Sequence, residues 1–262
     1  MALDLAQKSA SLKRSTPDSM LPSLAGLVRS MNCYYSNLIE GHDIHPIDIE
    51  RVLNNDFTRD TKKRDLQLEA KAHIAVQEWI DAGGLGGDIF SVDALCTIHR
   101  RFYENVPDSL HWVTNPKMGK KLRVVGGALR DVNVAVGRHI AISPEALPRF
   151  LTRYAEVFSK LGKVEVIMAA AAAHHRMAWI HPFADGNGRV MRLQSHALFL
   201  HTLNTGAVWS VARGLARSVQ SINPIWQAVT CLAATTLMDA AISVKKHFRP
   251  SPSISCKPAS IR

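Results

Sequence analysis

A twelve-residue stretch, 181–192, brings together side chains that could handle a nucleotide: His-Pro-Phe-Ala-Asp-Gly-Asn-Gly-Arg-Val-Met-Arg. His181 titrates near neutral pH and suits a general base. Asp185 offers the hard oxygen ligand that holds Mg²⁺ beside substrate phosphates. Arg189 and Arg192 are three residues apart, so on a helix they would share a face and could bind a polyphosphate. Nucleotidyl transfer needs this combination, a base on the attacking side and positive charge on the leaving side.

The local sequence predicts a helix, a tight loop and a second helix around these residues. Glu165 to Ile180 contains five consecutive alanines, and Pro182 disfavours helical geometry at His181, so the first helix should end there. The run Gly186-Asn187-Gly188 permits close approach of a ligand to the backbone. The chain is helical again from Arg189, which puts this run at a helix N-terminus that favours an anion. The competing interpretation is a packed loop histidine followed by an ordinary turn.

A second motif, Ser36-Asn-Leu-Ile-Glu-Gly, ends a helix predicted over Leu24 to Glu40. Ser36 and Glu40 are four residues apart on one helix face, and Gly41 is a typical residue after a helix end. A glutamate in the last turn lies at the unfavourable end of the helix dipole, so an arginine is its natural partner. The simpler alternative is an ordinary helix end.

The rest of the chain predicts a mainly α fold with one small β-hairpin. Further helices are expected over Arg64–Ile80, from Ser91 to about Tyr103, and from Ser143 to about Leu161. The segment 121–142 is rich in Val and Gly, and its alternating valines predict strands with turns at Gly126-Gly127 and Gly137-Arg138. We expect a flexible lead-in over 1–23, a single domain over 24–248 and a flexible Pro/Ser-rich tail over 249–262.

Composition narrows the class of protein. The chain has 262 residues, 47% of them hydrophobic, and its longest purely apolar run, Val166 to Ala173, is too short to cross a bilayer. The net charge of +10 favours acidic partners such as nucleotides or nucleic acid. The four cysteines include no close pair, so a zinc ribbon is not expected and a reducing, cytoplasmic location fits best. We expect no membrane partner.

The stretch 181–192 resembles the signature of the Fic (filamentation induced by cyclic AMP) family, His-Pro-Phe-x-Asp-Gly-Asn-Gly-Arg-x-x-Arg, at every defined position. The helix before it, the segment 127–142 and the segment Trp209–Arg217 also resemble Fic proteins, so the resemblance covers about residues 30 to 220. It implies a Fic fold with the hairpin as a flap. It also implies transfer of AMP from ATP, with Mg²⁺ as cofactor, to a Tyr, Thr or Ser hydroxyl of a protein.

The resemblance implies a role for each motif residue. His181 would deprotonate the hydroxyl, and Asp185 would bind Mg²⁺ between the α- and β-phosphates. The backbone of Gly186, Asn187 and Gly188, with the Asn187 side chain, would hold phosphate oxygens. Arg189 would steady the phosphates and the leaving group, Arg192 would bind the γ-phosphate, and Phe183 would anchor the loop as an apolar residue.

The motif at 36–41 resembles the family's inhibitory helix, [Ser/Thr]-x-x-x-Glu-[Gly/Asn]. The resemblance implies that Glu40 pairs with Arg192 and obstructs the γ-phosphate, with Ser36 and Gly41 completing the motif. The flap would dock an extended segment of the target through a strand edge at Val132 to Val136. The docking residues would be Asp131, Val132, Asn133 and Val134. Expected partners are ATP and a protein substrate, with self-modification and a homodimer as further hypotheses.

Three alternatives remain open from the sequence. The same site could remove AMP, with Glu40 positioning water. A basic nucleic-acid-binding regulator could have kept an inert Fic core, although no basic and aromatic residues interleave as in an RNA platform. His174, His181 and Asp185 could instead hold a transition metal in a hydrolase. The target protein and the modified hydroxyl are not identified by the sequence.

Overall fold

The structure is a computed structural model that describes residues 2–42, 44–114, 119, 121–137 and 139–218, all within one compact unit. The mainly α expectation is confirmed. The α-helices are α1 (Ala2–Ser15), α2 (Leu21–Ile39), α3 (Pro46–Leu53), α4 (Thr61–Asp81), α5 (Val92–Glu104), α6 (Leu147–Phe158), α7 (Lys163–Ile180), α8 (Asn187–Leu203) and α9 (Val211–Arg217). Short 3₁₀ turns occupy Asp18–Met20, Asp108–His111 and Pro144–Ala146. The strands are β1 (Trp112–Thr114), β2 (Lys121–Arg123), β3 (Ala135–Val136) and β4 (His139–Ile140).

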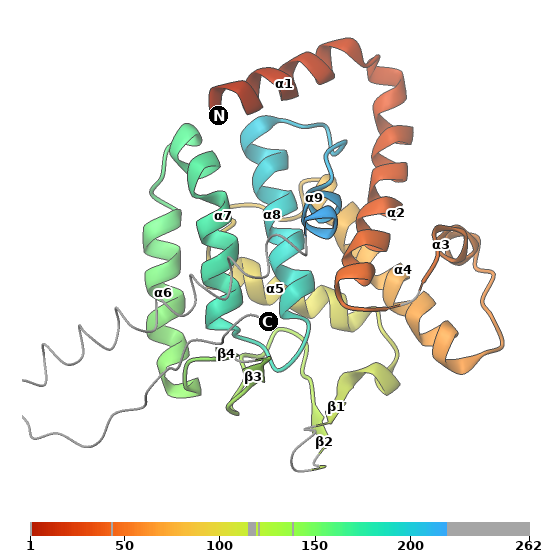
Figure 1. Cartoon of the computed structure of the whole chain (residues 1–262), viewed down its shortest axis with the longest axis vertical. Helices are drawn as coiled ribbons and strands as arrows, with labels where there is room; N and C mark the ends of the chain where they lie inside the picture. The colour runs from red at the N-terminus through yellow and green to blue at the C-terminus, as the bar shows by residue number, and fades with distance from the viewer. Residues whose placement is uncertain (1, 43, 115–118, 120, 138, 219–262) are drawn as a thin grey trace, which may run out of the picture. The chain divides into compact units, whose positions relative to one another are not determined.

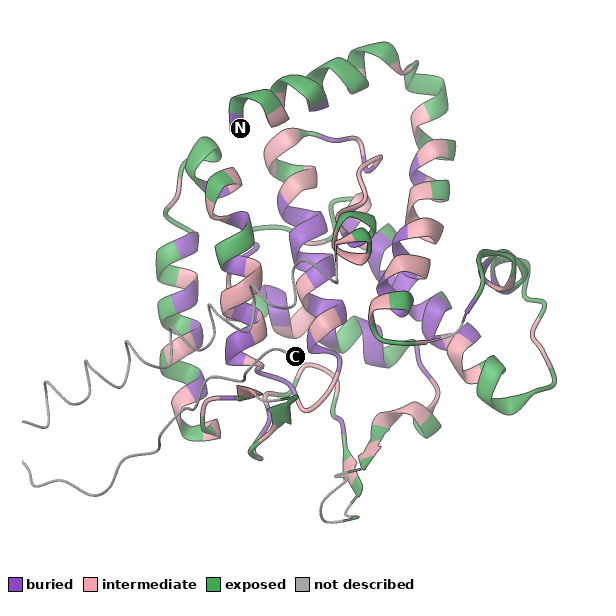
Figure 2. Cartoon of the chain, viewed as in Figure 1, coloured by how far each residue is buried: buried purple, intermediate pink, exposed green. Residues whose placement is uncertain are grey.

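Helix α8 is the centre of the fold, because it packs against α7, α5, α4 and α9 (Figure 1). The buried faces of α5, α7 and α8 turn toward one another and form the main core (Figure 2). Fully buried members of this core include Leu95, Ile98, Tyr103, Met177, Ile180, Phe183 and Leu193. The 181–186 loop joins α7 to α8, so both ends of that loop are fixed by the best-packed part of the molecule.

A smaller core holds α2 and α3 against α4. It consists of Cys33, Ile44, Ile49, Ala70 and Ile74, all buried. The motif at 36–41 follows directly after Cys33 on α2. This second core therefore positions the end of α2 against α4 and, through α4, against α8.

The flap hairpin is shorter than predicted. β3 pairs with β4 in antiparallel register, Ala135 opposite Ile140 and Val136 opposite His139, around a turn at Gly137 with φ of +59°; the other turn residue, Arg138, lies outside the described residues. Residues 131–134 precede the strand, although their exposure alternates as a strand's would. The buried Arg130 explains the difference, because it donates hydrogen bonds to the Val132 and Ile142 carbonyls and draws the backbone inward. A second pair, β1 with β2, adds a strand that was not predicted.

Two further predictions need correction. The lead-in over 1–23 is helical over Ala2–Ser15, because Ala2, Leu5, Ala6 and Ser9 form a stripe of helical spacing that packs toward α7 and α8. The helix expected from Ser143 to about Leu161 starts as a 3₁₀ turn, and α6 spans only Leu147–Phe158 with Pro148 in its first turn. The predicted domain end at 248 and the tail over 249–262 lie outside the described residues.

Candidate active site

His181 lies at the C-terminal end of α7, as Pro182 predicts. Its backbone has φ of +51°, a left-handed conformation that ends the helix, and its N–H still bonds to the Met177 carbonyl. Arg130 fixes the same residue from the flap side, donating from Nε to the His181 carbonyl over 2.7 Å. Burial and the Arg130 guanidinium lower the pKa of His181 from 6.5 to about 4. The imidazole is therefore neutral at physiological pH and can accept a proton.

Phe183 and Asn187 close the loop between α7 and α8. Phe183 is fully buried and stacks on the His99 ring of α5 at 3.9 Å, so it is the apolar anchor that was predicted. The Asn187 side chain accepts from the Phe183 N–H over 2.9 Å and donates to the Phe183 carbonyl over 2.8 Å. This bridge uses the Asn187 side chain to close the buried loop, and the role of Asn187 in holding phosphate oxygens stays a prediction.

Gly186 and Gly188 bring the backbone at the N-terminus of α8 close to other groups. Gly186 caps α8 with φ of +76°, and a Cβ there would press on Tyr103 and His99. A Cβ at Gly188 would collide with the Glu40 carboxylate and crowd the Arg192 guanidinium. The first N–H groups of α8 are therefore approached by an anionic side chain from α2, at a helix end that attracts anions.

The structure brings the 36–41 motif onto the second arginine of the 181–192 motif. Arg192 Nη2 lies 2.5 Å from Glu40 Oε1, and Arg192 Nε donates to Ser36 Oγ over 2.9 Å. Only 6% of the Arg192 side chain is exposed, against 33% of Glu40. Gly41 follows with φ of +78°, which allows the chain to leave the helix directly after Glu40.

Arg189 is engaged by a carboxylate that sequence reasoning missed. Arg189 Nη2 lies 2.5 Å from Glu69 Oε1 of α4, and both side chains are buried. The guanidinium also lies over the Phe102 ring, and its Nη1 is 3.8 Å from Asp185 Oδ2. The same Glu69 lies 3.4 Å from His42 Nδ1, and the nearby carboxylate raises the pKa of His42. Both motif arginines are therefore paired with glutamates.

An open cleft of about 260 Å³ lies beside Arg189 and Glu40, whereas His181 and Arg192 are not among its lining residues. Its lining includes the charged residues Glu40, Glu69, Asp185 and Arg189 and the apolar residues Val106, Leu110, Trp112 and Val113. Asp185 meets the requirement for Mg²⁺ in a site of this kind. Its side chain is 43% exposed and offers a hard oxygen at the rim of the cleft, whereas Glu69 is held by Arg189. One carboxylate fits a cation that is bound mainly through substrate phosphates.

Polar residues at regular spacing form a buried seam between α2, α4 and α8. Helix α4 contributes Glu69, His73, Gln77 and Asp81, four residues apart, and this spacing was the signal that could have predicted the seam. At its far end, Asp81 accepts from Arg29 of α2 over 3.0 Å and lies 2.6 Å from His196 Nε2 of α8.

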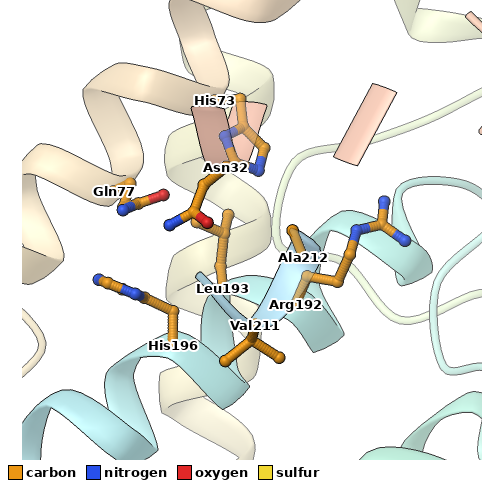
Figure 3. A pocket seen from close by; sticks show the side chains of 8 residues that line it. All are labelled: Asn32, His73, Gln77, Arg192, Leu193, His196, Val211 and Ala212. Atoms are coloured by element: carbon orange, nitrogen blue, oxygen red, sulfur yellow. The ribbon is translucent and has the colours of Figure 1, made fainter. Parts of the chain in front are cut away.

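The middle of the seam is a cavity of about 10 Å³, around which Figure 3 shows Asn32, His73, Gln77 and His196. Within the described part of the chain, Asn32 Oδ1, both His73 ring nitrogens and Gln77 Nε2 have no hydrogen-bond partner. A polar cavity of this size has room for about one water molecule.

The metal-hydrolase alternative gains no support from His174. Its Nδ1 lies 2.8 Å from Ser195 Oγ on α8, and burial lowers its pKa to about 4. Across residues 2–218, apart from the few positions not described, no three His, Cys, Asp or Glu side chains gather as a metal site. None of the helices described there combines the length and hydropathy that a bilayer span needs.

Comparison with known proteins agrees with this geometry. The Fic/DOC family model matches residues 89–199, from the start of α5 to α8. Protein adenylyltransferase Fic of Culex quinquefasciatus is 28% identical over 197 residues, which cover 72% of this chain and 36% of the relative. The Drosophila erecta protein of the same name is 25% identical, covering 74% of this chain and 38% of the relative. The match thus spans little more than a third of these curated relatives.

Solved structures show the same fold. A Fic family protein from Desulfovibrio desulfuricans G20 superposes with a TM-score of 0.68 at 17% identity, covering 88% of this chain and 67% of that one. The Fic-1 E274G variant from C. elegans superposes with a TM-score of 0.60 at 19% identity, covering 91% of this chain and 69% of that one. The loop after α7 and the N-terminus of α8 lie inside the family match, so residues 89–199 of the chain form a Fic/DOC family domain.

Proposed function

We propose that this chain is an autoinhibited protein adenylyltransferase, which transfers AMP from ATP·Mg²⁺ to a Tyr, Thr or Ser hydroxyl and releases pyrophosphate. The relatives named protein adenylyltransferase Fic support the reaction class. The observation that carries the proposal is the position of Arg192, beside the N-terminus of α8 and paired with both Ser36 and Glu40. A phosphate-binding arginine and its competitor are present in one chain.

The neutral His181 imidazole would accept the hydroxyl proton as the oxygen attacks the α-phosphate. The lowered pKa of His181 keeps its imidazole in the base form. A base with a low pKa is also a weaker proton acceptor, so it accelerates the proton transfer less. On the other side, the N-terminal N–H groups of α8 and the two arginines would stabilise charge on the departing pyrophosphate. Mg²⁺, when bound with ATP, would neutralise phosphate charge, and Asp185 is the residue that would hold it.

Glu40 would restrain this reaction by competition for Arg192. One guanidinium cannot offer its full fork of donors to a carboxylate and to a phosphate at the same time. A hundredfold suppression needs only about 3 kcal/mol, because each 1.4 kcal/mol is a factor of ten. A largely buried, charge-assisted pair can supply that amount.

Removal of AMP is a second candidate function. Glu40 lines the same cleft as Asp185, and a third of its side chain is exposed there. A carboxylate so placed could orient a water molecule toward a modified hydroxyl. In this case both Glu40→Gly and Glu40→Gln would abolish the removal of AMP from a modified target. Glutamine keeps the shape of the glutamate side chain but lacks its basic carboxylate.

The test is AMP transfer from α-labelled ATP to lysate proteins by wild type and three variants. Glu40→Gly should raise labelling about a hundredfold over wild type. Adding Arg192→Ala should cancel the gain, because the released ligand is then missing. Adding His181→Ala instead should lower transfer by about 10²–10⁴-fold while ATP·Mg²⁺ binding is retained. Full transfer without His181, or no transfer by any variant, would refute the proposal.

A further inference from the structure

Asp185 is held from beneath by the phenol of a buried tyrosine. Tyr103 of α5 donates from its hydroxyl to Asp185 Oδ2 over 2.9 Å. The Arg189 cation lies nearest to the same oxygen, at 3.8 Å. Among the described residues, the contacts of this carboxylate therefore fall on Oδ2, and Oδ1 is the oxygen left to face the cleft. The exposure of the side chain, 43%, agrees with that orientation.

Tyr103 itself cannot move easily. It is 2% exposed, and its ring packs edge-on against Phe102 and His111. Its backbone carbonyl is 3.0 Å from His111 Nε2, which fixes the last turn of α5. A phenol ordinarily has a pKa of about 10, so this group is a hydrogen-bond donor at physiological pH.

His99, one turn earlier on α5, fixes the backbone of the same loop. Its Nε2 lies 3.1 Å from the Asp185 carbonyl, and its Nδ1 accepts from the Gly127 N–H over 2.7 Å. Because Nδ1 accepts, Nε2 carries the proton and donates to that carbonyl. A Cβ at Gly186 would lie 3.2 Å from the Tyr103 ring and 3.4 Å from the His99 ring, closer than ordinary van der Waals contact. Helix α5 thus holds Asp185 by its side chain and by its backbone.

We propose, on the basis of the proposed function, that Tyr103 is a positioning residue for the magnesium ligand Asp185. Its hydroxyl occupies Oδ2 and turns Oδ1 toward the metal of ATP·Mg²⁺. A phenol that fixes one carboxylate oxygen removes the rotational freedom that the carboxylate would otherwise lose on metal binding. The hydrogen bond also stabilises the negative charge on Oδ2. Oδ1 is then the oxygen that binds the metal, so the carboxylate binds it in a single orientation.

The test measures how Mg²⁺ strengthens binding of a fluorescent ATP analogue to wild-type protein and to Tyr103→Phe. Binding is first measured in EDTA and then titrated with Mg²⁺. Tyr103→Phe keeps the ring and its packing, so binding in EDTA should equal that of wild type. The Mg²⁺ concentration at half-maximal response should rise about tenfold, the lower end of the range for residues that hold a metal ligand. Combining Tyr103→Phe with Asp185→Ala should give no shift beyond that of Asp185→Ala.

Tyr154→Phe is the matched control, because it also removes a buried phenol. Tyr154 donates to Gln194 over 3.0 Å within the core and does not line the cleft. In Tyr154→Phe, the Mg²⁺ concentration at half-maximal response should remain at the wild-type value. This result would separate positioning of Asp185 from general destabilisation of the protein. An unchanged midpoint in Tyr103→Phe, beside a normal wild-type response, would overturn this role alone. A wild-type protein that binds ATP without any response to Mg²⁺ would overturn both this role and the proposed function.

Discussion

Burial keeps the His181 imidazole in its neutral form, which is the form that the proposed base role requires. The ring sits in a loop closed by Phe183 and Asn187, and Arg130 adds a positive charge nearby. Both influences disfavour the imidazolium form. The residue is therefore ready to accept a proton across the physiological range, without the change of charge that an unperturbed histidine undergoes between pH 6 and 7.

A titration of the His181 ring by NMR tests this directly. In the absence of nucleotide, the imidazole resonance that disappears in His181→Ala should titrate with a midpoint near pH 4. Because the pKa is lowered, the base form of His181 persists as pH falls and is lost only below about pH 4. AMP transfer by Glu40→Gly should accordingly show no acid limb near pH 6.5. A midpoint near 6.5 would contradict the burial argument.

At the scale of elements, the end of α2 is held by polar contacts as much as by apolar ones. Arg192 binds its last turns through Ser36 and Glu40, and Asp81 holds Arg29 two to three turns earlier. Buried polar contacts are strong when complete but costly when one partner is removed. If Glu40 restrains the enzyme, the Asp81 contact should strengthen that restraint by keeping α2 against α8.

Replacing Asp81 with asparagine should therefore loosen α2. The substitution removes the carboxylate shared by Arg29 and His196 and leaves Arg29 only the more exposed Glu78, at 3.5 Å, which should cost about 3 kcal/mol in the free energy of unfolding. Basal AMP transfer should rise with Glu40 intact, and the rise should vanish when Arg192 is also replaced. Asp56→Asn is the control, since Asp56 forms an ion pair with Arg51 at the surface. Denaturant unfolding and labelling of the same preparations would show whether stability and restraint change together.

The flap hairpin offers one strand edge to an extended target segment. Ala141 donates to the Val134 carbonyl, so residues 134 and 141 form a hydrogen-bonded pair. Bonded and non-bonded pairs alternate along an antiparallel ladder, so Ala135 opposite Ile140 is a non-bonded pair. The N–H and carbonyl of Ala135 therefore point outward from β3. This edge lies within the predicted docking edge Val132 to Val136, and we expect a docked target segment to pair with Ala135.

Ala135→Pro should abolish modification of a target protein in the Glu40→Gly background. Proline removes the outward N–H without touching the bond between residues 134 and 141. Binding of ATP should be unchanged, because the flap residues do not line the cleft beside Asp185. Ala135→Thr keeps the N–H and favours a strand, so it should label the target normally. Equal labelling by both variants would show that the target docks elsewhere.

Across the whole molecule, the features that could be predicted from the sequence are those that neighbouring residues determine. Pro182 and Gly186 set the ends of α7 and α8, so the loop and the anion-binding helix end follow from neighbouring residues. The contacts of Arg130 and Glu69 join segments far apart in the chain, and no local pattern announces them. The short β3 was missed because Arg130 also bonds to the Ile142 carbonyl, twelve residues along the chain. The Asn187 bridge is local, since it returns to Phe183 four residues earlier, and it depends on how the loop folds rather than on residue type alone.

The charge state of buried histidines also concerns the whole fold. Burial lowers the pKa of His99, His174 and His181 to about 4 and that of His73 to about 3. Between pH 6.5 and pH 4 the unfolded chain binds protons at these residues that the native state does not bind. The free energy of unfolding therefore falls as pH falls through this window. The raised pKa of the half-exposed His42 acts in the opposite direction, but it is a single residue.

We expect the midpoint of urea unfolding to be clearly lower at pH 5.0 than at pH 7.5. One histidine with a native pKa of about 4 accounts for about 2 kcal/mol of this loss. His174→Gln tests the assignment, because glutamine can still bond to Ser195 but cannot take up a proton. The variant should lose about 2 kcal/mol less than wild type between the two pH values. An equal loss in both proteins would place the acid sensitivity in carboxylates rather than in this core.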